Sequence, residues 1–180
     1  THDFSIDESD IGDTALYDLA SDAVFHYKRD RYFLMSGNTG REGIYEYATG
    51  TKRFAGAEGT WRDAEDGRLE GNPIAQGSVD SCISFRLNID AHSRRTLHYW
   101  IAVGRDFEDV RRLHRRVRKE GVPAILDQTR SYWRSWLAKK PRDFKDLDSS
   151  IVDLYKRSLL IIRTQIDPGG AITAANDSDI

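Results

Sequence analysis

The sequence has few of the residues that usually reveal a function directly. Its 180 residues include one cysteine, Cys82, which excludes an internal disulfide and a thiolate metal cluster. That cysteine leaves the cellular compartment open, because many secreted proteins also lack disulfides. No apolar run approaches the roughly 18–20 residues that a membrane helix needs. We therefore expect no membrane partner.

Common catalytic and binding motifs are also missing. The five histidines show no spacing typical of metal ligands, so we expect no metal site. No G-x-S-x-G elbow supports Ser-His-Asp chemistry. Gly169-Gly170 follows a predicted helix, whereas a phosphate-binding glycine loop precedes one. The sequence thus predicts no cofactor.

What is present is typical of a globular protein. Hydrophobic residues make up 39% of the chain and charged residues 31%. The net charge of −2 conceals an asymmetry, because residues 105–142 hold 12 Lys/Arg against 5 Asp/Glu. The chain begins with Thr1, and its first residues already read as the interior of a domain. We therefore expect a piece of a longer protein, cut at both ends.

Residues 1–104 predict β-structure, because short aromatic and β-branched runs alternate with turn residues. The candidate strands are Thr14–Asp18, Ala23–Tyr27, Tyr32–Ser36, Gly43–Tyr47 and Thr51–Phe54. Turns are expected at 38–40 and 48–50, where glycine supplies a positive φ.

The clearest sheet pattern is a predicted hairpin of Cys82–Ile89 with Thr96–Gly104, joined by a loop at 90–93. Alternation with a period of two places one face of each arm in a core and leaves the other more polar. Trp100 lies on that second face, so a further sheet or domain is expected to cover it partly.

A long polar loop is expected at 56–77, and loops of this length are often functional. Trp61 could stack on a sugar ring. Two of the acids Glu58, Asp63, Glu65 and Asp66 could supply the carboxyl pair that glycoside hydrolysis requires. The alternatives are a turn-rich loop with an anchored Trp, or an interdomain or substrate-rim role for Trp61, Arg62 and Asp63.

From Arg105 onward the pattern is helical. Asp106 can cap a helix that carries the stripe Phe107, Val110, Leu113, His114 and Val117 and ends at Gly121. A second helix is expected over Pro123–Lys139, with a break at 141–143. Its buried side is predicted to comprise Leu126, Thr129, Tyr132, Trp133, Trp136 and Leu137.

The first of these helices carries a basic run at 111–119. Basic helices can neutralise nucleic-acid phosphates. The alternative, which we prefer, is a solvated face whose arginines pair with acids on the neighbouring β-domain. No nucleic-acid motif accompanies the run, so we expect no nucleic-acid partner.

A third helix begins near residue 146 and stops before Pro168. Its apolar residues recur at helical spacing, and its second half is apolar nearly all round. Its Leu and Ile side chains are expected to be the least covered apolar groups of the chain. It reads as the first piece of a larger all-helical body.

Several segments together resemble family 15 glycoside hydrolases, the prokaryotic glucoamylase-like enzymes with glucodextranases and some trehalases as relatives. The segments are HYK at 26–28, DRYFL at 30–34, EGTWRDAEDG at 58–67, NPIAQG at 72–77, VDS at 79–81, YWRSW at 132–136, LYKRSLL at 154–160 and GAITAANDSDI at 170–180. The resemblance is in register and covers nearly the whole chain.

The resemblance implies an antiparallel β-sandwich of the galactose-mutarotase-like supersandwich type, incomplete here, over 1–104. A helical linker at 105–145 and the start of an (α/α)6 barrel at 146–180 would follow. It also implies an inverting α-glucosidase whose acid and base glutamates lie in the barrel beyond Ile180.

The expected partner is an α-glucan or gluco-oligosaccharide, bound through the missing catalytic domain. Within this chain no residue is expected to be catalytic. Trp61, Arg62, Asp63, Asn176 and Asp177 are the candidates for a substrate-proximal or interdomain position. A non-catalytic carbohydrate-binding or interdomain scaffold module is the alternative.

Overall fold

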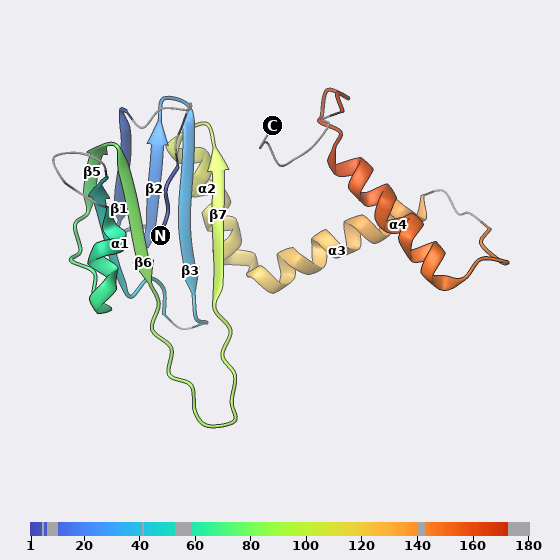
Figure 1. Ribbon diagram of the computed structural model, residues 1–180, viewed down its shortest axis with the longest axis horizontal. Coiled ribbons are helices and arrows are strands. Elements are labelled where there is room, and N and C mark those ends of the chain that lie inside the picture. The colour runs from blue at the N-terminus through green and yellow to red at the C-terminus, as the bar shows by residue number, and fades with distance from the viewer. Residues whose placement is uncertain (5, 7–10, 41, 53–58, 140–142, 173–180) are drawn as a thin grey trace. The chain divides into compact units, whose positions relative to one another are not determined.

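A computed structural model describes residues 1–4, 6, 11–40, 42–52, 59–139 and 143–172 (Figure 1). The chain divides into two compact units, 1–122 and 123–180. The first unit holds two antiparallel β-sheets and the helix α2 (Phe107–Glu120). The second holds the helices α3 (Val122–Ala138) and α4 (Ser149–Thr164), although Val122, the first residue of α3, belongs to the first unit. The predicted mainly antiparallel β character of the N-terminal part is confirmed.

The larger sheet has the order β5-β1-β2-β3-β7. Its strands are β1 (Asp13–Asp18), β2 (Ala23–Lys28), β3 (Arg31–Asn38), β5 (Ile74–Gly77) and β7 (His98–Gly104). The smaller sheet pairs β4 (Glu46–Thr51) with β6 (Val79–Ser84). The first three predicted strands are confirmed, and so is the turn at 38–40, where Gly40 has a φ of 91°.

The two faces of β2 belong to two different cores. Phe25 lies in a cluster with Leu34 of β3 and Val110 of α2, and its ring stacks on Phe107 at 4.4 Å. His26, the next residue of β2, lies on the opposite face, where its ring nitrogen contacts Ser81 of β6. The larger sheet is therefore covered by α2 on one face and by the smaller sheet on the other.

The helix α2 begins and ends where its sequence predicts. Asp106 accepts a hydrogen bond from the Asp109 amide at 2.8 Å, and Gly121 follows the last turn with a φ of 82°. Val110 and His114 are the buried residues of its predicted stripe. Figure 1 shows α2 running along the sheet beside β2, β3 and β7.

The predicted hairpin of 82–89 with 96–104 is wrong. β6 pairs with β4 in the smaller sheet, and β7 pairs with β3 in the larger one. The chain does reverse at the expected place, since the Ser93 amide donates to the Asp90 carbonyl. Alternation fixes which side chains share a face but not which strand is the partner, so a crossing between sheets fits the pattern equally well.

The apolar row of β7 is far less covered than its alternation predicts. Tyr99, Ile101 and Val103 are 41%, 46% and 54% exposed, whereas Ala102 on the opposite face is buried under α2. The pairing of Val103 with Phe33 places this row on the face toward the smaller sheet. β7 is an edge strand of the larger sheet. The smaller sheet packs over β1 and β5, at the other edge, and so leaves the row of β7 exposed.

The predicted turn at 48–50 and the division into two strands there are also wrong, because β4 runs straight through it. Gly50 serves a close approach instead of a turn. A Cβ at Gly50 would lie 2.7 Å from the Thr60 methyl group. The region predicted as one long loop contains α1 (Thr60–Asp63), the 3-10 turn η2 (Ala64–Asp66) and strand β5.

The second unit has exposed apolar faces. Neither α3 nor α4 contains a buried residue, so the predicted buried side of the second helix is wrong for the described chain. In α4, Leu154 and Ile161 are 66% and 61% exposed. They are not the most exposed apolar groups, however, because Leu19 of the first unit exceeds them at 81%. The predicted break at Pro141 lies outside the described residues.

No helix in the described part of the chain is long and apolar enough to cross a membrane.

Replacing Val110 with Ala tests the docking of α2 on the sheet. We expect V110A to lower the free energy of unfolding by about 2 kcal/mol, because Val110 is fully buried between Phe25 and Ala102. V117A is the control, since it makes the same change in helix propensity at a partly exposed site of α2. Its cost should stay below about 1 kcal/mol in urea unfolding. Equal losses would show that Val110 does not anchor the helix.

Candidate functional site

The predicted loop site places Trp61 and Arg62 on the short helix α1. Trp61 is 46% exposed, and the Arg62 guanidinium carbon lies 4.9 Å from the centre of its ring. Such a cation–π pair holds an indole in a defined orientation at a surface. Thr60, the preceding residue, is buried and fixes the helix to the smaller sheet.

The anchor of α1 is Asp80 of β6. Its Oδ2 accepts a hydrogen bond from the Thr60 amide at 2.8 Å, and its side chain is buried. Gly59 precedes Thr60 with a φ of 97°, and a Cβ there would lie 2.4 Å from Asp80 Oδ2. Gly50, the register partner of Asp80, makes room for Thr60. The two glycines thus let the start of α1 approach the carboxylate.

The charge of Asp80 is held in this setting by opposing effects. Burial raises its pKa, while the hydrogen bonds from Thr60 lower it. Asp3 raises the pKa further and Lys52 lowers it. Lys52 is itself buried and forms an ion pair with Asp3. These contacts tie Asp80 into the scaffold, and through Thr60 its carboxylate positions Trp61.

Two of the four candidate acids shape the loop itself. Asp63 Oδ2 accepts from the Glu70 amide, and Asp66 Oδ1 accepts from the Arg68 amide, both at 2.9 Å. Glu65 is exposed, and Glu58 lies outside the described residues. A catalytic pair among these acids therefore stays a prediction.

Of the five predicted site residues, the structure brings together Trp61, Arg62 and Asp63 on one short helix. The other two, Asn176 and Asp177, lie outside the described residues. Their expected position near a substrate stays a prediction.

A second polar cluster was not predicted. Ser81 Oγ lies 2.8 Å from Nε2 of His26 and 3.2 Å from Nδ1 of His2. The other nitrogen of His2 lies 2.7 Å from the Tyr99 hydroxyl. His2 reaches this place through a β-bridge to Ser81, which pairs their backbones at 2.7 and 3.0 Å.

The chemistry of this cluster is that of a core network. His26 and Ser81 are fully buried, so no substrate reaches the hydroxyl. Burial, the main cause, lowers the pKa of His26 to about 3 and that of His2 to about 4. Both imidazoles are therefore neutral at pH 7. Strand alternation places His26 on the face of β2 opposite Phe25, so its position on that face could have been predicted from the sequence. Its contact with Ser81 could not, because the two residues are 55 positions apart in the chain.

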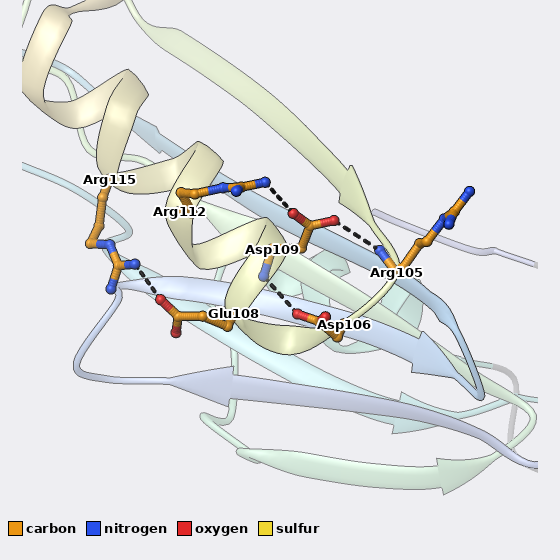
Figure 2. A network of polar contacts seen from close by, with 6 residues as sticks. All are labelled: Arg105, Asp106, Glu108, Asp109, Arg112 and Arg115. Carbon is orange, nitrogen blue, oxygen red and sulfur yellow. Dashed lines mark hydrogen bonds and ion pairs between the residues drawn. The ribbon is translucent and has the colours of Figure 1, made fainter.

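The basic helix satisfies much of its charge internally. Figure 2 shows Arg112 directed at Asp109 and Arg115 at Glu108, and Arg116 pairs with Glu120 one turn further on. The expected pairing with acids of the β-domain is thus wrong for Arg112 and Arg115, whose ion-pair partners belong to α2, and Arg116 also has an ion-pair partner on α2. Residues three or four apart, as in two of these pairs, are neighbours on a helix surface.

Within the described residues, no group of three or more His, Cys, Asp or Glu side chains could hold a metal ion. No family model, curated protein or solved structure matches the chain.

Lowering the pH should destabilise the first unit through His26. The pKa of His26 in the folded chain lies below the ordinary value near 6.5. Below that pH, His26 is therefore protonated in the unfolded chain while it is still neutral in the folded chain. Stability is therefore full above about pH 6.5 and is lost as the pH falls toward 3, by up to about 1.4 kcal/mol per pH unit for this group.

Urea unfolding at a series of pH values measures this dependence. H26Q should flatten the slope below pH 6.5, whatever its effect on stability at pH 7. H98Q, at a partly exposed histidine of β7, is the control and should keep the slope of the parent chain. Parallel curves for H26Q and the parent chain would contradict the assignment.

Proposed function

We propose that this chain is the β-domain, linker and first barrel helix of an inverting α-glucosidase of the glucoamylase type. The general acid and general base would be two glutamates of an (α/α)6 barrel that α4 begins. The substrate would be an α-glucan or gluco-oligosaccharide. In this proposal the present chain supplies scaffold and substrate-rim contacts, and no catalytic residue.

The observation that carries the proposal is the set of in-register segments that resemble family 15, together with the order of the two units. A β-rich unit precedes a helical one, as a sandwich followed by a barrel requires. The segment at 26–28 lies on β2, residues 31–34 of the next segment lie on its partner β3, and the segment at 154–160 lies within α4. These three segments lie on elements of the kind that the proposal needs.

The exposed face of α4 gives further support. Ile151 near its start, and Ile161 and Ile162 near its end, are each more than half exposed, as is Leu147 just before the helix. An inner helix of a barrel is covered by its neighbours, and burying such a side chain stabilises by roughly 1.5–3 kcal/mol. Neighbouring barrel helices would supply that cover.

The enzyme that contains this chain should release β-glucose first. We expect proton NMR of its reaction with maltopentaose to show the β-anomer before mutarotation, because an inverting displacement turns an α-linkage into a β-product. The 180-residue chain alone should release no glucose and serves as the control. Release of α-glucose first would contradict inversion, and no hydrolysis of maltopentaose, isomaltose or trehalose would contradict the proposal.

A non-catalytic carbohydrate-binding module is the second candidate, and Trp61 favours it. The indole is half exposed, its orientation is fixed by Arg62, and carboxylates of the same loop lie nearby in the sequence. A flat aromatic face beside hydrogen-bonding groups is suited to a sugar ring.

A fluorescence titration of the whole chain with maltooligosaccharides separates the two candidates. The glucosidase proposal predicts no saturable change in tryptophan emission, because binding belongs to the barrel. The module predicts a saturable change that W61F abolishes. W136F, on the separate helix α3, is the control and should leave such a change intact. A change of that kind would move the function to Trp61.

A further inference from the structure

A basic cavity lies beside α2 in the first unit. Its volume is about 410 Å³, within the range of pockets that hold small ligands. The turn that joins β1 to β2 closes one side of it. The lining residues are Ala20, Ser21, Arg111, His114, Arg115, Arg118 and Lys119. Four of these seven carry a positive charge, and none carries a carboxylate.

The charges at this cavity differ from those on the rest of the helix. Arg112 and Arg116 do not line it, and each is neutralised by an acid of α2. Arg111, Arg118 and Lys119 form no ion pair within the part of the chain that the structure describes. Three of the four cations that line the cavity are therefore without an acidic ion-pair partner among the described residues.

Two of these cations are held by neutral groups. The Arg111 guanidinium carbon lies 5.4 Å from the centre of the Phe107 ring, and Arg118 donates to the Ser21 carbonyl at 3.5 Å. A ring face and a carbonyl oxygen orient a guanidinium without cancelling its charge. Arg115 is the exception, because it is shared with Glu108.

His114 adds a neutral donor to the same wall. It is 2% exposed, and its Nδ1 accepts a hydrogen bond from Trp100 Nε1 at 3.2 Å. The neutral ring then carries its proton on Nε2, where it can donate. Burial and Arg118 lower the pKa of His114, with a smaller contribution from Arg111, while the Ser21 backbone and Asp22 oppose them.

We propose that this cavity binds a small phosphate-bearing anion. Guanidinium groups match phosphate oxygens with paired hydrogen bonds, and Arg111, Arg115 and Arg118 follow one face of α2 at steps of four and three. A long nucleic acid fits less well, because its contacts would extend to Arg112 and Arg116, whose charges are already paired.

Calorimetric titration of the whole chain with inorganic phosphate and pyrophosphate, in a buffer free of other oxyanions, tests the site. We expect saturable binding with one site per chain. R111Q and R118Q should each weaken it by about tenfold, the effect of losing one charge-assisted contact. R112Q and R116Q are matched controls on the same helix and should change it by less than about twofold.

The four variants also distinguish binding at a defined site from nonspecific attraction to the positive charge of the helix. Equal weakening by all of them, or no saturable heat with either anion, would overturn the proposal. Binding of a 20-base-pair DNA that is unaffected by R118Q, together with no phosphate binding, would overturn it in favour of a polyanion surface. Circular dichroism of each variant confirms that the fold is kept.

The imidazole of His114 gives an independent readout by NMR. Saturating phosphate should raise its pKa, because the anion offsets the field of Arg111 and Arg118 while Asp22 is unchanged. The shift should be reduced in R118Q and kept in R112Q. A pKa that does not respond to bound phosphate would place the anion elsewhere and overturn the assignment.

Discussion

The contact on which the first unit depends is the packing of α2 against β2 and β3. The Phe25–Phe107 stack and fully buried Val110 fix the helix along the sheet. Once that face is buried, the helical period decides the rest. Val110 and His114 point to the sheet, while Arg112 and Arg116 face outward, where acids one turn away can pair with them. The same packing positions the basic cavity, because it brings His114, one of the lining residues, into hydrogen-bond contact with Trp100 of β7.

In the smaller sheet, the two-residue period of a strand likewise decides which side chains lie on which face. Asp80 and Ser81 are neighbours on β6, and both are buried, so each face of this strand is covered. Asp80 holds α1 on one face, and Ser81 meets His26 of the larger sheet on the other. Two adjacent residues thus join three layers. The orientation of Trp61 depends on a carboxylate nearly 20 residues further along the chain.

Local patterns in the sequence were enough to locate the strands β1 to β3 and the ends of α2. The Asp106 cap and the glycine after the last turn each depend only on residues a few positions away in the chain. The partners of β6 and β7 could not be found this way, because alternation carries no information on pairing. The same limit hid the contact of His2 and His26 with Ser81, which joins residues 79 and 55 positions apart. Trp61 and Arg62 were identifiable as a candidate site, but their anchor on Asp80 was not.

The two candidate functions differ in what they require of the second unit. A helix of 16 residues is marginal in water by itself, and most of its stability in proteins comes from packing an apolar face. α4 has such a face, with Leu154, Ile161 and Ile162 all more than half exposed. A carbohydrate-binding module built around Trp61 gives these side chains no role, since Trp61 belongs to the first unit. The glucosidase proposal gives them one, because further barrel helices would bury them. The exposed Leu and Ile side chains of α4 are therefore accounted for within the glucosidase proposal, while the Trp61 surface is compatible with either function.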